Sequence, residues 1–428
     1  MNAYSAPDVL IIGGGAIGVS CALELRRRGA DVRLVEREAK VGAGCSYGAA
    51  GLISPHHATP IANPVAMRQG IRWMFRPASP FALRARPGLL PWLLRYALAS
   101  TQTRASRSAE VMRELTALSL AAHIEYIGQG IDTSLRQRGS LSVYESADGL
   151  AAGQRETRSH GTSTEVFPRS RLESLGVRLG PTVAGAIHVI EDAHLDPFQF
   201  VTAVGEAALD AGAAIDTNVE VHRLVTERGR VTRVESSQGD IRPKEVVLAG
   251  GVWSSRLARR AGVFAPVEGG KGYHIDLPLA TGDPDLPIYM EAVKVLAVPL
   301  PGRLRLAGMF ELAGLDPTVR TARLHAMRAV AERTLDGLAG RTVLETWAGL
   351  RPCTPDGLPM IGRTAEVGNL TLATGHAMKG IALAPVTGRL VAQQLGGEQP
   401  RIDLAPFHPD RFHTAFRRLA ASFPGRAA

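Results

Sequence analysis

One short segment near the start of the chain constrains its fold more than any other. Residues 9–12 form an uninterrupted apolar run, Val-Leu-Ile-Ile, which is typical of a strand buried on both faces of a parallel sheet. The run continues into Gly-Gly-Gly-Ala-Ile-Gly at 13–18, which fits the pattern G-x-G-x-x-G, and then into a helical segment at 19–28. A second apolar run at 32–35 ends in Glu36. This order predicts a β-α-β unit of the Rossmann type.

Each position of the glycine motif has a physical role in such a unit. Gly13 permits the tight turn, Gly15 allows a pyrophosphate to approach the backbone, and Gly18 lets the helix pack close to the strand. The pyrophosphate then lies at the N-terminus of the helix that follows, where free N–H groups and the helix dipole favour an anion. Glu36, at the end of the second strand, is placed to accept hydrogen bonds from an adenosine ribose. The acid argues against a 2′-phosphate, although the adjacent cation, Arg37, leaves this point open.

The next segment favours FAD over NAD. Residues 42–55 are rich in small side chains and lack a helical or strand period, so their backbone can run beside a flat ring system. A nicotinamide enzyme more often continues into another crossover helix. No second strand–GxGxxG–helix unit is visible, which argues against reduction by NAD(P)H and favours a substrate that docks directly on the flavin.

Composition excludes several other classes of protein. The 428 residues are 45% hydrophobic and 21% charged, which is ordinary for a globular chain of two or three domains. The net charge of +9 comes from cations scattered along the chain, without a basic arm or a zinc spacing, so we expect no nucleic acid partner. Three distant cysteines (Cys21, Cys45 and Cys353) argue against a disulfide framework and against a metal site.

The sequence also bears on location. We find no signal peptide and no apolar stretch of about 18 residues, so we expect a cytoplasmic protein. Residues 73–98 are rich in Arg, Pro, Trp and Leu. We favour a helix packed on its own domain, because Pro91 interrupts the apolar face. Peripheral attachment to the inner face of a membrane is the alternative.

Farther along the chain, strands dominate the prediction. Residues 107–127 form a helix, residues 139–144 and 273–277 alternate as strands, and a hairpin is expected around Pro301-Gly302. The predicted fold is α/β, with a Rossmann-like FAD-binding domain and a second domain of mostly antiparallel sheet plus helices that caps the flavin. We assign 1–75, 192–262 and 345–428 to the discontinuous FAD-binding domain, and 76–191 and 263–344 to the substrate (cap) domain.

Several motifs together resemble the D-amino-acid dehydrogenase branch of the FAD-dependent D-amino-acid and glycine oxidase superfamily. They are the opening β-α-β unit, the loop 45–55, Lys-Gly-Tyr at 271–273, Trp-Ala-Gly-Leu-Arg-Pro at 347–352, Thr-Pro-Asp-Gly at 354–357 and Gly-His-Ala-Met-Lys-Gly at 375–380. They occur in the family's order along nearly the whole chain. One departure is Ala49, where such sequences often have Asn, and it weakens any transfer of substrate.

The resemblance implies a set of cofactor contacts. Val219 corresponds to the residue whose backbone meets the adenine, and Gly250 to the turn beneath the cofactor. The turn at 375–380 passes the pyrimidine end of the flavin in the family, where a cation or an N–H dipole would stabilise the reduced ring. The predicted cofactor-binding residues are Gly13, Gly15, Ala16, Ile17, Gly18, Glu36, Arg37, Gly44, Cys45, Ser46, Gly51, Leu52, Ile53, Val219, Gly250, Gly375, His376, Met378, Lys379, Gly380 and Ile381. Gly349 stands where sarcosine-oxidase relatives carry the linking Cys, so we expect non-covalent FAD.

Arg351 is the main candidate for binding substrate. It lies between Leu350 and Pro352, so we expect it to be partly buried, and a buried guanidinium needs an anionic partner. In the family the Arg of this motif binds the substrate carboxylate. The alternative is a structural salt bridge to an acid such as Asp356. The other catalytic candidates are Tyr273, Tyr289 and His376; Tyr273 and His274 point to opposite faces of one strand, so at most one of these two lines the pocket.

The resemblance implies oxidative deamination of a D-amino acid. A hydride passes from the α-carbon to flavin N5, and the imine is hydrolysed to a 2-oxo acid and ammonia. The alternative is a glycine- or sarcosine-type oxidase or a D-hydroxyproline dehydrogenase. A further alternative is a binding protein without turnover. The sequence leaves the amino acid, the electron acceptor (quinone, dye or O₂) and the oligomeric state open.

Overall fold

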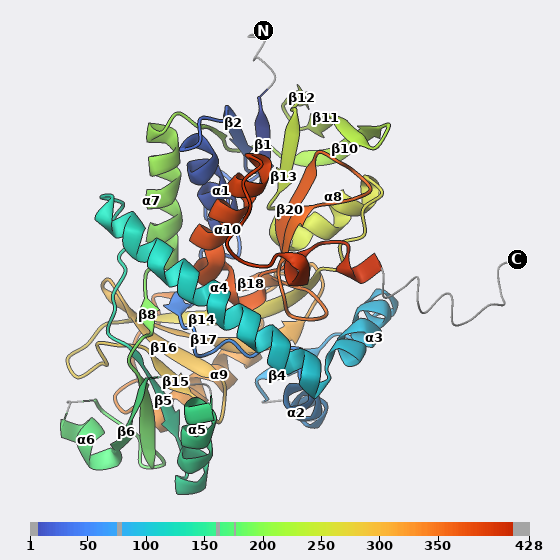
Figure 1. Cartoon of the computed structure of the whole chain (residues 1–428). Helices are drawn as coiled ribbons and strands as arrows, with labels where there is room; N and C mark the ends of the chain where they lie inside the picture. Colours follow the sequence, from blue (N-terminus) through green and yellow to red (C-terminus); the bar gives the residue numbers. More distant parts are fainter. Residues whose placement is uncertain (1–6, 75–78, 160–162, 175–176, 414–428) are drawn as a thin grey trace, which may run out of the picture.

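A computed structural model describes residues 7–74, 79–159, 163–174 and 177–413. Two main sheets organise these residues (Figure 1). The smaller sheet lies in the upper part of the view with α1, α7 and α10 beside it, and the larger sheet occupies the lower part. The long helix α4 (Gln102–Gly128) runs diagonally across the molecule and packs against α10.

The smaller sheet contains the predicted β-α-β unit, which the structure confirms. Its strand order is β19-β20-β13-β1-β2-β9, and every strand is parallel to its neighbour except β19. Helices α1 (Ala16–Arg26), α7 (Pro197–Asp210) and α10 (Gly380–Leu395) pack on it through apolar side chains. The strands are β1 (Val9–Ile12), β2 (Val32–Val35), β9 (Ala214–Asp216), β13 (Glu245–Leu248), β19 (Met360–Arg363) and β20 (Leu370–Thr374).

The larger sheet has nine strands and is mostly antiparallel, as predicted. Its order is β18-β14-β17-β16-β15-β5-β7-β6, with β4 beside β17; only β15–β5 and β17–β4 pair in parallel. The predicted hairpin is confirmed, since Leu300 pairs with Arg303 across its turn. The strands are β4 (Phe81–Leu83), β5 (Ser140–Tyr144), β6 (Thr164–Pro168), β7 (Gly185–Val189), β14 (Glu268–Pro278), β15 (Ile288–Met290), β16 (Val295–Leu300), β17 (Arg303–Leu312) and β18 (Glu345–Cys353).

Smaller elements complete the described chain. Two minor sheets are formed by β10 (Val221–Glu227), β11 (Arg230–Ser236) and β12 (Gly239–Ile241), and by β3 (Leu52–Ile53) with β8 (Ala193–His194). The other helices are α2 (Pro64–Met74), α3 (Leu90–Ala99), α5 (Ala147–Ser159), α6 (Arg169–Ser174), α8 (Ser254–Arg260) and α9 (Thr321–Thr334). Short 3₁₀ turns are η1 (Pro87–Leu89), η2 (Gly251–Trp253), η3 (Ala377–Lys379) and η4 (Ala405–Phe407).

The cores of the molecule follow the two main sheets. One apolar cluster covers each face of the six-stranded sheet, and a third fills the nine-stranded sheet against α9. Strand β18 pairs with β14 in the larger sheet, although residues 345–353 were assigned to the FAD-binding domain. The boundary placed at 75/76 touches residues 75–78, which lie outside the described residues. The division into domains stays a prediction.

The segment at 73–98 differs from its predicted form, and residues 75–78 of it lie outside the described part of the chain. Pro91 does not interrupt α3 but lies in its first turn, where the missing N–H has no intrahelical acceptor to lose. The helix packs on its own chain, since Trp92 Nε1 donates to the Cys353 carbonyl at 3.1 Å. Leu90, Leu94 and Leu98 stay exposed, one turn apart. In the described residues, no helix combines the length and apolarity needed for a membrane span.

Candidate active site

A cavity of about 1420 Å³ lies between the two main sheets. Its walls come from the carboxyl ends of β1, β2 and β13, from the loop 44–52, from β17 and β18, and from the start of α10. The carboxyl edge of a parallel sheet is where ligands bind in open α/β folds. The cavity is large enough for a dinucleotide and an additional small molecule.

The glycines of the first turn leave room for backbone alone. Gly13 has φ of +109°, and a Cβ there would lie 2.7 Å from the Ala249 carbonyl oxygen. A Cβ on Gly18 would lie 1.8 Å from the carbonyl oxygen of Gly13, so helix and strand touch at this point. Gly15 lines the cavity, and its nearest neighbour, Ser46 Oγ, would be 3.3 Å from an added Cβ. Gly15 therefore has the position predicted for pyrophosphate contact, whereas Gly18 acts through packing.

The acid of the second strand faces the same end of the cavity. Glu36 Oε2 accepts a hydrogen bond from the Gly14 N–H at 2.5 Å, and Oε1 accepts one from the Glu38 N–H at 2.9 Å. These bonds orient the carboxylate at the cavity wall. The Arg37 guanidinium lies 3.7 Å from the centre of the Trp253 ring, and both side chains line the cavity. Val219 and Gly250 line it as well.

The small-residue loop forms a long wall of the cavity. Gly44, Cys45, Ser46, Gly51 and Leu52 all line it. The loop is joined to the nucleotide end because Ser46 Oγ accepts a hydrogen bond from the Ala16 N–H at 3.1 Å. Two residues predicted to contact the cofactor, Ile53 and Gly375, do not line the cavity. Ile53 is fully buried where β3 pairs with β8, and Gly375 lies behind the wall with a φ of +84° that favours glycine.

Helix α10 begins at the opposite wall of the cavity. His376, Met378, Lys379, Gly380 and Ile381, all predicted to bind the cofactor, line the cavity. Burial lowers the pKa of His376 to about 3, and its Nε2 lies 3.0 Å from Thr387 Oγ1, so the imidazole is neutral. Burial lowers the pKa of Lys379 to about 8, opposed by the nearby Asp192 carboxylate. The positive charge at this end comes from Lys379 and the helix N-terminus rather than from His376.

Arg351 projects from β18 into the cavity. Its Nη1 donates to the Met309 carbonyl at 2.8 Å, and burial lowers its pKa. In the described part of the chain no carboxylate lies within ion-pair distance of the guanidinium. Asp356, the partner considered in the alternative, is instead held by Arg411 at 2.7 and 3.1 Å. A Cβ on Gly272 would lie 2.1 Å from Arg351 Cζ, so this glycine makes space for the guanidinium.

The backbone that supports Arg351 is itself unusual. Met309 has φ of +61°, in the left-handed region that side chains other than Gly seldom adopt. It lies where the register of β17 against β14 shifts, a β-bulge that redirects the local backbone. The bulge aims the Met309 carbonyl at the guanidinium. The sequence carries no signal for this strain.

Of the aromatic candidates, only Tyr289 and His376 line the cavity. Tyr273 does not line the cavity; it is buried in the core of the larger sheet and donates to Glu311 Oε2 at 2.8 Å. This prediction was wrong because strand alternation defines two faces without showing which one meets the cavity. His274 is also absent from the cavity wall, and Gly272 lines it instead. Tyr289 does line the cavity, edge-on to His57 at 5.0 Å between ring centres.

One polar cluster beside the cavity was missed by the sequence analysis. Asp192 is fully buried, its Oδ2 accepts from Ser140 Oγ at 2.6 Å, and burial raises its pKa to about 7. His57 Nδ1 lies 3.0 Å from Ser54 Oγ and 4.0 Å from Asp192 Oδ2. Burial lowers the pKa of His57 to about 3. Ser140 and Asp192 are far from Ser54 and His57 in the sequence, and only Ser54 belongs to a motif, the loop 45–55.

The residues present fit FAD. The glycine turn, the orienting bonds on Glu36, the loop of small residues and the cationic start of α10 lie along one continuous cavity. This arrangement has room for a pyrophosphate at Gly15, a ribose at Glu36 and a flat ring between the loop and β18. A separate cluster, His274, Asp276 and Glu345, has the residue types of a metal site, but Arg305 already neutralises Asp276.

Comparison with known proteins agrees with the site. The sequence matches the family of FAD dependent oxidoreductases (DAO) over residues 8–394. A D-amino acid dehydrogenase of Methylobacterium sp. is 33% identical, with 96% of this chain and all of the relative covered. That of Bradyrhizobium diazoefficiens is 30% identical, covering 95% and 99%. The crystal structure of glycine oxidase from Geobacillus kaustophilus superposes with a TM-score of 0.74 at 25% identity, covering 95% and 99%. The chain therefore belongs to the DAO family of FAD-dependent oxidoreductases.

Proposed function

We propose that this protein oxidises a D-amino acid to a 2-oxo acid and ammonia with non-covalent FAD. The observation that carries the proposal is Arg351, a half-buried arginine whose guanidinium faces the cavity without a carboxylate partner among the described residues. A charge drawn partly out of water in this way is stabilised by an anion, and a substrate carboxylate supplies it. The relatives named D-amino acid dehydrogenase favour this substrate class over the glycine, sarcosine or D-hydroxyproline alternative.

The chain's own residues bind and orient the substrate. Arg351 holds the carboxylate with two parallel N–H bonds, which fixes its plane, while the Met309 carbonyl fixes the guanidinium. Tyr289 and the apolar side chains of β16 and β17 bound the rest of the space. When bound, FAD accepts the hydride from the α-carbon. No general base is required if the amine is neutral, and the released imine hydrolyses in water.

Two observations support non-covalent attachment. Gly349 lines the cavity at the position where a linking Cys would stand. Burial raises the pKa of Cys45 to about 11 and that of Cys353 to about 12, so neither thiol is a ready nucleophile. Precipitation with trichloroacetic acid should leave all yellow colour in the supernatant. Colour that stays in the pellet would contradict this part of the proposal.

The cellular setting is part of the same proposal. A cytoplasmic enzyme that touches the inner face of the membrane would place the exposed leucines of α3 against lipid. The acceptor that re-oxidises the flavin is then a quinone, with a dye or O₂ as the alternatives. Co-sedimentation with liposomes, compared between wild type and Leu94→Glu, tests the attachment. Equal sedimentation of the two proteins would count against it.

The decisive experiment is anaerobic reduction of the purified yellow protein. We expect bleaching by D-amino acids and none by their L-enantiomers. Glycine, sarcosine and D-hydroxyproline belong in the same panel, because bleaching by one of them alone would favour the alternative. A yellow protein that no amino acid reduces would overturn the proposed function and leave a flavin-binding protein without this turnover.

A further inference from the structure

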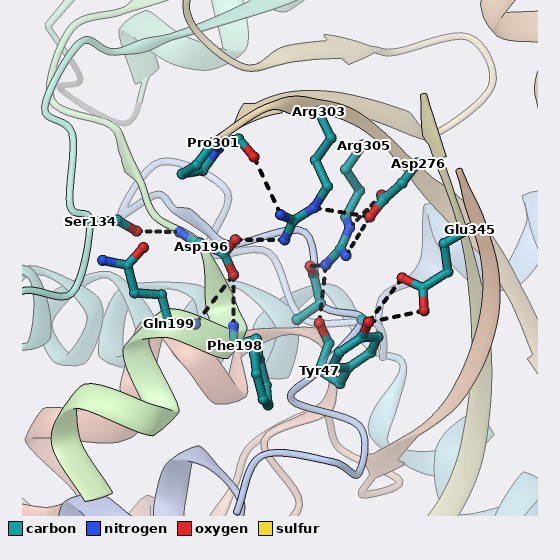
Figure 2. A network of polar contacts seen from close by, with 12 residues as sticks. Tyr47, Ser134, Asp196, Phe198, Gln199, Asp276, Pro301, Arg303, Arg305 and Glu345 are labelled. Atoms are coloured by element: carbon teal, nitrogen blue, oxygen red, sulfur yellow. Dashed lines mark hydrogen bonds and ion pairs between the residues drawn. The ribbon is translucent and has the colours of Figure 1, made fainter. Parts of the chain in front are cut away.

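A buried arginine of the larger sheet reaches across to the loop that walls the cofactor cavity. Arg305 lies on β17 and is 1% exposed. Its Nε and Nη2 donate to the two oxygens of Asp276, each at 2.8 Å, which is a bidentate pair. Its remaining terminal nitrogen, Nη1, donates to the carbonyls of Tyr47 and Ala49 at 3.1 and 3.0 Å (Figure 2).

The loop is fixed at three successive carbonyls. Between the two held by Arg305, the carbonyl of Gly48 lies 3.3 Å from Nδ1 of His274 on β14. A carbonyl oxygen only accepts, so this ring nitrogen carries the proton. The Tyr47 hydroxyl also donates to both carboxylate oxygens of Glu345, at 2.9 and 3.1 Å (Figure 2). Every one of these partners belongs to the larger sheet.

The same loop meets the cofactor cavity directly. Gly48, Ala49 and Ala50 line it, together with Trp347 of β18. A Cβ on Gly48 would lie 2.1 Å from the Trp347 ring, so the loop backbone lies against the indole. A small shift of this loop would change the shape of the cavity.

The arginine that binds substrate and the arginine that holds the loop share three adjacent strands. Arg351 of β18 is paired in register with Gly270 of β14, and Asp276 of β14 is paired with Arg305 of β17. A sheet of paired strands is rigid. The sheet therefore sets the distance between Arg351 and Arg305. Because Arg305 is bonded to the loop 47–49, it also sets the distance between Arg351 and that loop.

We propose that Arg305 is a positioning residue that fixes the flavin-facing loop 47–49 relative to Arg351, with His274 as its lesser partner. Arg305 does not line the cavity, and it acts through the backbone of the loop. The two bonds of Nη1 satisfy buried donors of the guanidinium, and because their acceptors belong to a cavity wall they also join that wall to the sheet. The expected effect on substrate oxidation rests on the proposed function. The expected effect on FAD binding does not.

Arg305→Lys is the test, because Lys keeps the charge opposite Asp276 but cannot make the bidentate pair and both carbonyl bonds. We expect FAD affinity, measured by titration of the apoprotein, to fall about tenfold, and the visible circular dichroism of bound flavin to change. Reduction by substrate should slow by up to about a hundredfold at little-changed substrate affinity, as expected when reacting atoms are displaced by about 1 Å.

Arg303→Lys is the matched control. Arg303 lies two residues away on the same strand and pairs with the same carboxylate, Asp276, at 3.0 Å. Its other partners are Asp196 at 2.6 Å and the Pro301 carbonyl at 3.4 Å, and among the described residues it makes no hydrogen bond to the loop 47–49 (Figure 2). We expect this variant to lower the melting temperature while FAD affinity and the flavin dichroism stay as in wild type. The contrast between the two variants separates positioning from general stability.

A second variant keeps the proposal testable if Arg305→Lys does not fold. In the wild type the His274 ring stacks on Trp347 at 5.4 Å between ring centres. His274→Phe keeps an aromatic ring there and removes the hydrogen bond to the Gly48 carbonyl. We expect FAD affinity to fall about threefold and the visible circular dichroism of bound flavin to change. Wild-type FAD affinity and flavin dichroism in the folded variants would overturn the proposal. Failure of the wild type to be reduced by any amino acid would overturn the proposed function alone, since FAD affinity and dichroism still test the loop.

Discussion

The two ends of the cavity are built in different ways. At the nucleotide end, one continuous stretch of chain supplies the turn, the helix start and the acid, and contact is made largely by backbone. At the substrate end, Arg351, Met309 and Gly272 come from three different strands of the larger sheet. The first end depends on glycines that leave room for backbone and on one acid close to them in the sequence, and the second depends on one side chain held by distant neighbours. Substitutions should therefore fail for different reasons at the two ends.

The largest effect is expected at the nucleotide end, from Gly18→Ala. The added Cβ would lie 1.8 Å from the carbonyl oxygen of Gly13, and backbone cannot move aside as a flexible side chain could. We expect the purified variant to retain no FAD, measured as the flavin-to-protein absorbance ratio.

Gly128→Ala, at the end of α4, is the control because its added Cβ meets no atom within 4 Å. It should bind FAD like wild type. Full flavin content in Gly18→Ala would show that the turn tolerates a side chain and that the close packing of α1 on β1 is not required.

The next effect belongs to the substrate end. Arg351→Lys keeps the charge but loses the planar fork, so the carboxylate plane is no longer fixed. We expect flavin reduction to slow by about a hundredfold, with FAD content and melting temperature little changed. Stopped-flow reduction beside a melting curve measures both.

Arg411→Lys is the control for Arg351→Lys and should show the opposite pattern of effects. Arg411 is paired with Asp356 and its variant should lose stability while the surviving holoenzyme is reduced at the normal rate. If substrate reduced the flavin of Arg351→Lys at the wild-type rate and with unchanged apparent substrate affinity, Arg351 would not be the carboxylate anchor.

A smaller effect at the nucleotide end comes from Glu36→Ala. A hydrogen bond to a charged group contributes on the order of 1.5–3 kcal/mol, so FAD affinity should fall by about tenfold or more. Glu36 also orients the backbone of Gly14 and Glu38, so part of the loss would come from the altered turn. Glu38→Ala, which leaves the Glu38 N–H in place, is the control. An unchanged FAD dissociation constant in Glu36→Ala would contradict the ribose assignment.

The sequence predicted the nucleotide end well because its signals are local. The strand, the glycine turn, the helix and the acid all lie between Val9 and Glu36, and each follows from short-range geometry. The hairpin at 295–312 was predictable for the same reason, since a tight turn joins two alternating runs. The Arg351 candidate came from its apolar neighbours and from the family resemblance, and the structure adds its lack of an acidic partner among the described residues.

The substrate end was harder because its contacts join distant segments. Alternation correctly placed Tyr273 and His274 on opposite faces, yet one side chain enters the core and the other reaches the loop. Arg305 and Asp192 carry no motif, and their importance appears only when β17 meets the loop and when residue 192 meets residues 54, 57 and 140. Pro91 was misjudged because a proline in the first helical turn resembles a break when only the apolar pattern is considered.

The smallest expected effect lies where the two regions meet. Asp192 is buried against Ser140 of the larger sheet and lies near His57 of the loop that follows β3. Its pKa is raised from 3.8 to about 7 by burial. Between about pH 4 and 7 the folded protein therefore holds a proton that the unfolded chain releases, so this carboxyl makes the free energy of unfolding fall as pH rises.

Asp192→Asn should remove that dependence, since the amide keeps the shape without a titrating proton. His57 and His376, whose pKa values burial lowers to about 3, act in the opposite direction over an overlapping range, so only the difference between variant and wild type isolates Asp192. We expect the two proteins to match near pH 4.5 and the variant to gain relative stability towards pH 7.5, by at most about 1.4 kcal/mol per pH unit. Urea unfolding at several pH values measures this, and Asp336→Asn, at an exposed carboxylate, is the control. A constant difference across the range would show that Asp192 is ionised in the folded protein, and that its charge, rather than its proton, joins the two regions.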